Sequence, residues 1–406
     1  MAGLKRKAPF LKKKTKHKIN TMKNFTFYNP VRIHFGQDQY DKISEELLGY
    51  NNILLTYGMG SIKQNGIYDK VKEQLQGKNI IEFGGIGANP EYETLMQAVE
   101  IGKKENIDFI LAGGGGSVID GSKFIAAAIK YQGNDPWDML AKYAKFNDAV
   151  KLGTVLTIPA TGSEMNGGAV ITRVSTKDKL AFGSPLLMPV FSILNPEVMY
   201  SLPDVQISNG IIDAFIHITE QYITYPVNGA VQDAYSASLL KVLIEEVPKV
   251  LEDRKNYDAN ANLMWAATMA LNGLLSAGVP EDWSTHLIGH EITAQYGVDH
   301  AQTLAIVLPG VLNIMKDEKE DKLLHFAKNV WNIDISDKDS AIKNAIEKTE
   351  EFFHNLNIKT RLSDYKIPES AIDIICNKLE ERKYVKLGEN KNISPDIVKK
   401  ILKTRI

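Results

Sequence analysis

The strongest constraint on the fold is a change of hydrophobic pattern about half-way along the chain. From about Lys23 to Asp204, short apolar runs such as NNILLTYG, NIIEFGG, DFILAGGGGS, GTVLTIPA and PVFSILNP alternate with amphipathic stretches such as YETLMQAVEIGKKEN. This alternation is typical of βαβ units around a parallel sheet that is buried on both faces. From Ser208 onward the periodicity is helical. The sequence predicts an α/β domain at residues 22–204 and an all-helical domain at residues 205–406.

The first 21 residues differ from the rest of the chain because they are rich in lysine and arginine and contain no acidic residue. We expect them to form a disordered basic arm, or a leader that precedes an internal start at Met22. The formal net charge of −1 gives the chain as a whole no attraction to nucleic acid or membranes. The single cysteine, Cys376, excludes an intrachain disulfide and favours the cytosol. Apolar runs are too short for a transmembrane helix.

A run of four glycines, from Gly113 to Gly116, follows the apolar stretch DFILA. A helical pattern begins soon afterwards, near Val118. Glycine lets the backbone approach a ligand closely, and the free N–H groups at a helix N-terminus stabilise an anion. We therefore predict a pyrophosphate-binding loop, with a tight turn without a ligand as the alternative. The pattern differs from the GxGxxG fingerprint of many dinucleotide-binding domains.

A second glycine turn, at Gly58 and Gly60, follows the strand predicted to end at Tyr57. An acidic residue at such a turn would bind a ribose 2′-hydroxyl and repel a 2′-phosphate, and this turn contains none. Ser61 and Lys63 can instead accommodate a phosphate dianion. The turn therefore favours NADP over NAD, and a solvated turn with a surface lysine is the alternative.

Histidines cluster in the second half of the chain. Asp213 and His217 are four residues apart and share one face of a predicted helix. His286 and His290 have the same spacing, and His300 follows. Each pair alone is more often a buried polar pair, but both in one domain favour a site for Zn²⁺ or Fe²⁺. Either all three of the later histidines bind the metal, or His290 lies beside the reacting group instead.

Several motifs occur in a fixed order from Met22 to the C-terminus: FGGIGANPEYETL, GGGGSVIDGSK, TIPATGSEMN, DKLAF, DAFIHITEQY and EDWSTHLIGHE…DHAQTLAIVLP. Through them the chain resembles the iron-containing, or type III, alcohol dehydrogenase family. Within that family it is similar to the bacterial NADPH-dependent aldehyde reductases and butanol dehydrogenases. The resemblance implies a dehydroquinate synthase-like architecture, in which the active site lies between a dinucleotide-binding domain and a helical domain.

The resemblance also implies roles for individual residues. It makes Asp213, His217, His286 and His300 the metal ligands, and it places His290 in the nicotinamide pocket. The catalytic group is thus predicted to comprise Asp213, His217 and His290. Taken with the turns described above, the predicted cofactor-binding residues are Gly58, Gly60, Ser61, Lys63, Gly114, Gly115, Gly116, Ser117, Asp120, Thr157, Thr161, Ser163 and Lys179. Met59 lies where the NADP-using branch of the family often has a further glycine.

The predicted reaction is reversible hydride transfer between NADP(H) and a small primary alcohol or aldehyde. A divalent metal, Fe²⁺ or Zn²⁺, would polarise the substrate oxygen, and His290 or a water would exchange its proton.

Two alternatives remain open. One is a dehydroquinate synthase-like or glycerol-1-phosphate dehydrogenase-like enzyme for a phosphorylated substrate, which would need a basic cluster near the metal. No lysine or arginine lies between Gly278 and Met315. The other is a non-catalytic nucleotide-binding protein, which the complete set of ligands argues against. We expect a cytoplasmic homodimer or larger homo-oligomer that binds neither nucleic acid nor membranes.

Overall fold

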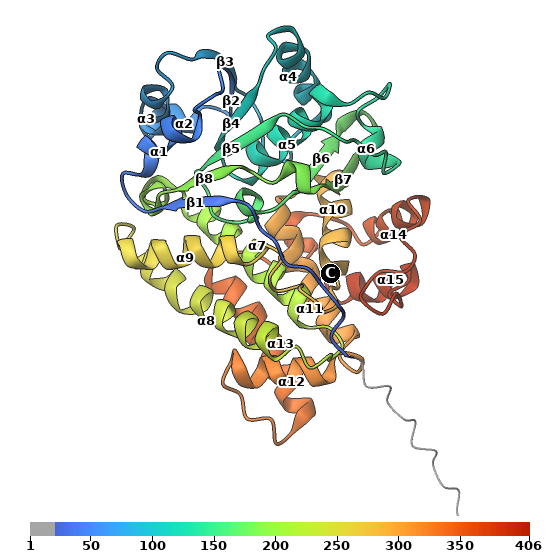
Figure 1. Ribbon diagram of the computed structural model, residues 1–406. Helices are drawn as coiled ribbons and strands as arrows, with labels where there is room; N and C mark the ends of the chain where they lie inside the picture. The colour runs from blue at the N-terminus through green and yellow to red at the C-terminus, as the bar shows by residue number, and fades with distance from the viewer. Residues whose placement is uncertain (1–20) are drawn as a thin grey trace, which may run out of the picture.

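The computed structural model describes residues 21–406, so all but the last residue of the predicted basic arm lies outside the described part. The first half of the chain forms a parallel six-stranded sheet with the order β1-β8-β5-β4-β2-β3 (Figure 1). Its strands are β1 (Arg32–Phe35), β2 (Asn52–Tyr57), β3 (Asn79–Phe83), β4 (Phe109–Gly114), β5 (Lys151–Leu156) and β8 (Phe191–Leu194). The predicted parallel sheet is confirmed.

Helices pack around this sheet, with the apolar faces of their amphipathic sequences turned toward it. The helices of the first half are α1 (Lys42–Glu46), α2 (Ser61–Gln64), α3 (Ile67–Gln74), α4 (Tyr92–Lys104), α5 (Gly116–Lys130) and α6 (Asp138–Ala141). Strand β4 is buried along its whole length, and α5 packs on it while α4 packs on α5. The continuous apolar run of β4 is therefore the pattern of a strand covered on both faces.

Three strands were not predicted from the sequence. Strand β1 has only four residues, and none of them is fully buried, so its apolar signal is weak. The other two, β6 (Gly168–Arg173) and β7 (Asp178–Gly183), form a separate antiparallel hairpin with Thr172 opposite Lys179. The hairpin alternates buried and exposed positions, which produces no continuous apolar run.

The strand order creates a natural position for a ligand. The chain runs outward from β2 to β3, then returns to place β4 on the other side of β2 and continues to β5 and β8. The switch point therefore lies between β2 and β4, and ligands of open α/β sheets bind beyond the carboxyl ends of strands at such points. The turns that begin at Gly58 and Gly115 lie there.

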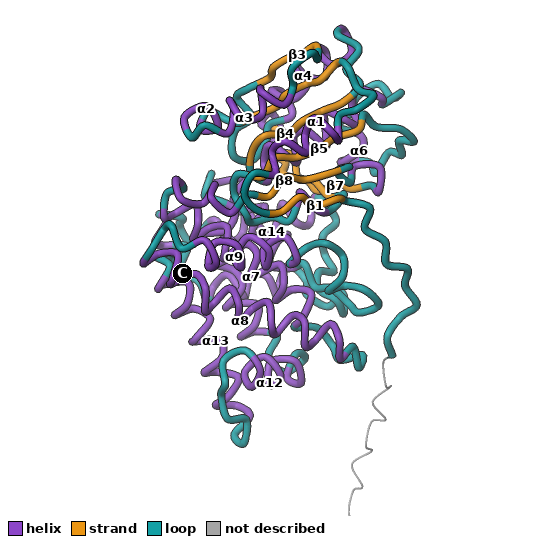
Figure 2. Tube along the Cα trace, turned by 60° about the vertical axis from the view of Figure 1, so that its left-hand side comes forward, coloured by secondary structure: helices purple, strands orange, loops and turns teal. Residues whose placement is uncertain are grey.

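The second half is helical, as predicted. Figure 2 shows the strands gathered at one end of the molecule and these helices at the other. The elements are α7 (Asp204–Tyr222), α8 (Ala230–Glu252), α9 (Tyr257–Met269), α10 (Ser284–Tyr296), α11 (His300–Ile314), α12 (Glu320–Asn329), α13 (Lys338–Asn355), α14 (Ala371–Glu381) and α15 (Pro395–Lys403). Among residues 21–406, no helix combines the length and the apolar character that a membrane crossing requires.

Helix α7 is the central helix of this half and its contact with the sheet is unusually close. From Gly210 to Tyr222 every residue is buried. At Gly210 an added Cβ would lie 2.3 Å from the carbonyl oxygen of Pro159, in the loop after β5. Only a residue without a side chain fits there. The helix that carries Asp213 and His217 is thereby held directly against a loop of the sheet.

Candidate active site

A cavity of about 670 Å³ lies between the sheet and the helical half. Its lining comes from both parts of the chain, including the start of α5, the loop after β5, the hairpin β6–β7, and helices α7, α10 and α11. The predicted site residues that line it are Gly116, Ser117, Asp120, Thr161, Ser163, Lys179, Asp213, His217, His286, His290 and His300. Residues predicted from distant parts of the sequence therefore share one cavity.

Three potential metal-binding side chains meet at one end of this cavity. The Oδ1 atom of Asp213 lies 3.6 Å from Nε2 of His300 and 3.9 Å from Nε2 of His286. One ligand atom from each of these residues lies within 4.8 Å of the other two. His217 is adjacent, because its Nε2 atom lies 3.8 Å from the same Asp213 oxygen and its ring stacks on His286. It is not part of the mutually close set of three.

The chemistry of this cluster fits a divalent cation. Two atoms that face each other in this cluster, Oδ1 of Asp213 and Nε2 of His286, are buried and have no hydrogen-bond partner among the described residues. Leaving such atoms unpaired costs free energy, so their concentration at one point calls for a bound partner. A carboxylate with several imidazoles is a donor set that Zn²⁺ or Fe²⁺ accepts.

The protonation states of Asp213, His217 and His300 suit the same interpretation. Burial lowers the pKa of His217 to about 4, against the opposing effect of Asp213. Burial also places the pKa of His300 well below its ordinary value, and the Lys179 ammonium adds to this effect. Burial opposes ionisation of Asp213, but the neighbouring His217 and His286 hold its pKa below the ordinary value. Neutral imidazoles and an ionised carboxylate are the forms that bind metals, so His286, whose pKa is raised to about 9, has to lose a proton when a metal binds.

Glu220 is a candidate site residue that sequence reasoning missed. Its carboxylate accepts a hydrogen bond from the backbone N–H of Thr285 at 2.6 Å and also contacts Nδ1 of His286. Burial lowers the pKa of His286, but Glu220 and then Asp213 outweigh that effect and raise the pKa to about 9. The contact turns Nε2 of His286 toward Asp213, as carboxylates beside metal-binding histidines commonly do. The signal was present, because Asp213, His217 and Glu220 share one helical face.

His290 lies beside the cluster rather than in it. Its ring centre is 5.0 Å from that of His300 and 6.3 Å from that of His286. Burial lowers its pKa well below the ordinary value, with Lys179 adding to the effect, so the ring is neutral at physiological pH. Its Nε2 atom has no hydrogen-bond partner among residues 21–406.

Trp283 forms an apolar wall next to these histidines. Its ring centre is 5.2 Å from that of His286, and Leu271 and Leu287 line the same cavity. The residue has a φ of 63°, in the left-handed region that bulky residues rarely adopt. The preceding Asp282 is buried in an ion pair with Lys319 at 2.9 Å and accepts a hydrogen bond from the backbone N–H of Ser284. These contacts hold the strained turn in place.

The other end of the cavity contains the glycine loop. Helix α5 begins at Gly116, immediately after β4 and Gly115, so its first N–H groups face the cavity at Gly116 and Ser117. A Cβ at Gly116 would lie 2.4 Å from the side chain of Thr161 in the loop after β5. The absence of a side chain therefore lets two loops meet at this point. Gly114, Gly115 and Thr157 lie outside the cavity lining.

Asp120 and Ser163 line the cavity, but their polar atoms bind protein groups. The Ser163 hydroxyl donates to Oδ1 of Asp120 at 2.6 Å, and Oδ2 of Asp120 accepts from the backbone N–H of Val170 at 2.8 Å. The buried Lys123 donates to the Ser163 hydroxyl at 2.8 Å and to the carbonyl of Gly168 at 2.8 Å. These bonds join α5, the loop after β5 and the hairpin. Lys123 was not singled out from the sequence, although it lies in the motif GGGGSVIDGSK.

Lys179 enters the cavity from strand β7. It is 5% exposed, and its ammonium donates a hydrogen bond to Oδ1 of Asn89 at 2.7 Å. Burial lowers its pKa to about 8, although Asp213, Asp120 and Asp299 partly offset this effect. It is the only lysine or arginine among the described residues that line the cavity.

The turn after β2 lies outside the cavity lining but at the same sheet edge as the glycine loop, since Tyr57 pairs with Gly113. Gly58, Gly60 and Ser61 form this turn.

The turn itself contains no acidic residue, as noted from the sequence, but Lys63 meets one from elsewhere. In the structure its ammonium lies 3.6 Å from a carboxylate oxygen of Glu82 and 4.7 Å from the ring centres of Tyr57 and Tyr68. The neighbouring strand β3 thus brings an acidic residue, Glu82, close to a turn that has none of its own. Both charged side chains are partly exposed, which weakens the ion pair.

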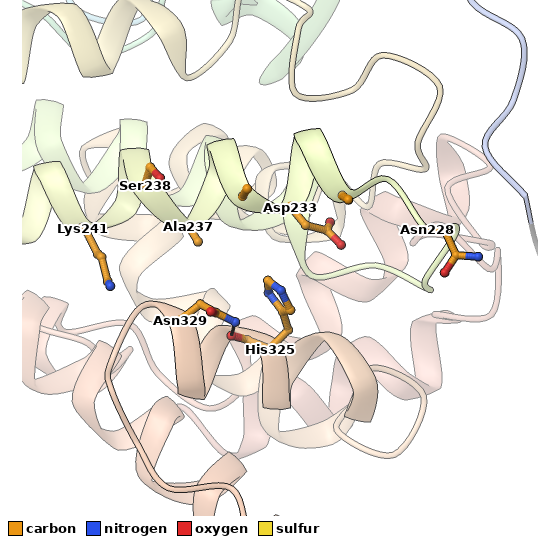
Figure 3. A pocket seen from close by; sticks show the side chains of 9 residues that line it. Asn228, Asp233, Ala237, Ser238, Lys241, His325 and Asn329 are labelled. Atoms are coloured by element: carbon orange, nitrogen blue, oxygen red, sulfur yellow. Dashed lines mark hydrogen bonds between the residues drawn. The ribbon is translucent and has the colours of Figure 1, made fainter.

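A second cavity, of about 480 Å³, lies between helices α8 and α12 (Figure 3). Asp233 and Lys241 enter it from α8, and His325 and Asn329 enter it from α12. His325 is hydrogen-bonded to Tyr222, as expected of an ordinary structural histidine. None of the predicted site residues lines this cavity.

Comparison with known proteins agrees with this geometry. Residues 30–196 match the family model for iron-containing alcohol dehydrogenase, and residues 207–406 match the model for the C-terminal part of Fe-containing alcohol dehydrogenases. The chain is 49% identical over 382 residues to the NADPH-dependent aldehyde reductase YqhD of Escherichia coli, across 94% of this chain and 99% of that protein. It is 40% identical over 391 residues to the probable NADH-dependent butanol dehydrogenase 1 of Bacillus subtilis, across 95% of this chain and 100% of that protein.

The crystal structure of Escherichia coli YqhD superimposes with a TM-score of 0.94 at 47% identity, across 95% of this chain and 100% of that one. The chain belongs to the iron-containing alcohol dehydrogenase family. The resemblance expected from the sequence motifs is confirmed, and with it the class of alcohol or aldehyde oxidoreductase.

Proposed function

We propose that this chain catalyses reversible hydride transfer between NADP(H) and small primary alcohols or aldehydes, with the help of one divalent metal ion. One observation carries the proposal. A single cavity contains both the cluster of Asp213, His286 and His300 and the N-terminus of α5 at Gly116 and Ser117. A cation site and an anion site thus lie in one space, as a dehydrogenase that uses a metal and a dinucleotide requires.

We propose Asp213, His217, His286 and His300 as the metal ligands. When bound there, Fe²⁺ or Zn²⁺ supplies Lewis-acid polarisation of the substrate oxygen. The single carboxylate of Asp213 leaves the site with a net positive charge, which favours the anionic form of an alcohol oxygen. Glu220 contacts Nδ1 of His286 and thereby orients its Nε2 atom toward the proposed metal.

The proposed dinucleotide sites are the turn at Gly58, Gly60, Ser61 and Lys63, and the loop from Gly114 to Ser117. The adjacent groups Asp120, Thr157, Thr161, Ser163 and Lys179 complete the proposed set. When bound, the nicotinamide ring supplies or accepts the hydride. Preference for NADP(H) is supported by the turn itself, which carries no carboxylate, and by the NADPH dependence of the relative at 49% identity.

His290 is the proposed partner for proton exchange with the substrate oxygen, directly or through a water molecule. The ring lines the cavity beside the metal cluster, and its Nε2 atom has no hydrogen-bond partner among the described residues, so this nitrogen is free to exchange a proton. Trp283, Leu271 and Leu287 provide an apolar wall for a short aliphatic or aromatic substrate. Lys179 is the one basic side chain among the described residues of the cavity lining, which argues against a phosphorylated substrate.

The test is elemental analysis of the purified chain together with turnover of a series of short aldehydes. We expect about one Fe²⁺ or Zn²⁺ per chain, and faster reduction with NADPH than with NADH. A chain that contains metal and turns over only phosphorylated compounds would contradict the substrate assignment. A clear preference for NADH would contradict the cofactor assignment. We further propose a cytoplasmic location and no binding of nucleic acid, which the single cysteine and the near-neutral net charge support. A homodimer or larger homo-oligomer is proposed from the family resemblance alone.

A further inference from the structure

Arg382, directly after α14, connects three elements that are far apart in the sequence. Its Nη2 atom donates to Oδ1 of Asp178 at 2.6 Å and to the carbonyl of Lys177 at 3.3 Å, where strand β7 begins. Its Nη1 atom lies 2.5 Å from Oε1 of Glu291 on α10. The side chain of Arg382 is 12% exposed and that of Glu291 is 1% exposed. We call Arg382, Asp178 and Glu291 the Arg382 clamp.

The clamp lies directly behind two residues of the proposed site. Asp178 precedes Lys179, and successive side chains of a strand point to opposite faces. Asp178 therefore faces Arg382, while Lys179 enters the cavity. On α10, Glu291 follows His290, which also lines the cavity. Helix α10 packs against both β7 and α14, and Figure 1 shows these three elements side by side.

The hairpin β6–β7 depends on such contacts for its position, because an isolated two-stranded hairpin is marginally stable in water. On the side of the sheet, Glu93 accepts hydrogen bonds from the backbone N–H groups of Val174 and Ser175 at 3.3 and 3.2 Å. On the side of the helical half, Arg382 holds the start of β7. A planar guanidinium can bind two acceptors at once, which suits this bridging position.

We propose that Arg382 is a positioning residue: by fixing the hairpin on α10, it sets the place of Lys179 relative to His290 and the metal cluster. This inference rests on the proposed function, which makes Lys179 a cofactor-binding residue; we place it at the nicotinamide end because it lines the same cavity as His290 and the metal cluster. A change in the clamp moves the nicotinamide end and leaves the metal ligands and the adenosine end in place.

Two variants test the clamp. Asp178→Asn removes the charge that ties the hairpin to Arg382. The double variant Arg382→Met with Glu291→Gln removes the bridge without leaving a buried carboxylate unpaired, which would by itself be strongly destabilising. We expect kcat/KM for NADPH to fall on the order of ten- to hundredfold in the double variant, and less in Asp178→Asn, because small misplacements of reacting groups have effects of this size. Metal content and the Kd of 2′-phospho-ADP-ribose, which lacks the nicotinamide, are expected to stay unchanged.

The matched control is Arg405→Met with Glu350→Gln. Arg405 is 6% exposed and paired with Glu350 at 2.7 Å, and neither residue lines the cavity. We expect this control to lower the melting temperature without a selective loss of NADPH turnover. An equal kcat/KM for NADPH in the two double variants would contradict the proposed role of the Arg382 clamp. An equal loss of 2′-phospho-ADP-ribose binding would also overturn it, since a general structural defect would then explain the result. Absence of NADPH turnover in the unmodified chain would overturn the proposed function, and the clamp with it.

Discussion

The two ends of the active-site cavity differ in how completely their polar groups are bonded. At the end beside the sheet, Asp120, Ser163 and Lys123 bind one another and nearby backbone groups. At the end beside the helical half, Oδ1 of Asp213 and Nε2 of His286 are buried and have no hydrogen-bond partner among the described residues. Ser163 and Lys123 are as well buried as Asp213 and His286, so burial alone does not explain the difference.

The difference indicates two ways to prepare a binding site. The sheet end is rigid before a ligand arrives, because its side chains already hold the loops together and the free donors are backbone N–H groups. The helical end keeps its side-chain atoms unpaired, so that a cation can complete their bonding. We therefore expect changes at the helical end to act first on metal binding, and changes at the sheet end to act first on the cofactor.

The largest effect is expected from His286→Ala. Loss of one ligand should release the metal and lower turnover by roughly three orders of magnitude, because Lewis-acid stabilisation is worth several kcal/mol. Elemental analysis and steady-state kinetics measure both quantities. His325→Ala is the control, since that histidine lies in the cavity between α8 and α12. Full turnover with retained metal in His286→Ala would remove His286 from the ligand set.

A smaller effect is expected from Glu220→Gln, because it leaves all ligands in place and weakens only the contact that orients His286. Metal affinity should fall about 10- to 100-fold, as for other carboxylates that support metal-binding histidines. Competition with a chelator measures the Kd. Glu164→Gln is a useful comparison, because Glu164 is equally buried but binds Thr268 beside the sheet end. Similar metal affinities for the two variants would contradict the division between the two ends.

A pH dependence of cofactor binding is expected from Lys179. Its pKa is lowered to about 8, so the ammonium is charged below that pH and becomes neutral above it. The KM for NADPH should therefore rise roughly tenfold as the pH increases through 8, since a charge-assisted hydrogen bond is lost. Lys179→Met should show a high KM with no such rise, and Lys179→Arg should keep a low KM at high pH. A rise that persists in Lys179→Met would assign the titration to another group.

The smallest effect is expected from Lys63→Met. The side chain already contacts Glu82 and is half exposed, so its contribution to a 2′-phosphate contact is limited. The ratio of kcat/KM for NADPH to that for NADH should fall by roughly two- to fivefold, the equivalent of an exposed ion pair. Kinetics with both cofactors provide the measurement, and Lys72→Met, which removes another lysine that contacts Glu82, is the control. An unchanged ratio in Lys63→Met would exclude this residue from cofactor selection.

Much of the fold could be predicted because its signals are local. Strands β2, β3, β4 and β8 lie within the apolar runs that predicted them, and β5 begins two residues before its run, at Lys151. Helix α4 coincides with the amphipathic stretch YETLMQAVEIGKKEN. The hairpin β6–β7 could not be predicted in this way, because its position depends on contacts with Asp120 and Lys123 of α5, with Glu93 and with Arg382 rather than on its own pattern. The division of the chain into domains near residue 204 stays a prediction, although α7 begins at that residue.

The site was predictable where residues share a helical face and unpredictable where elements from different regions meet. The spacing of Asp213 and His217 was informative, and Glu220 could have been added by the same rule. The contact of Lys63 with Glu82 depends on the pairing of β2 with β3, which the sequence does not specify. The roles of the individual site residues stay predictions until the variants above are measured.

The close packing at Gly210 limits how this active site can change. A Cβ at position 210 would collide with the backbone of Pro159, so any residue other than glycine would push α7 away from the sheet. Hydride transfer tolerates little separation, since reacting atoms must approach to about 3–3.5 Å. Variants selected for bulkier substrates are therefore expected to replace Trp283 or Leu271 with smaller residues and to retain glycine at position 210.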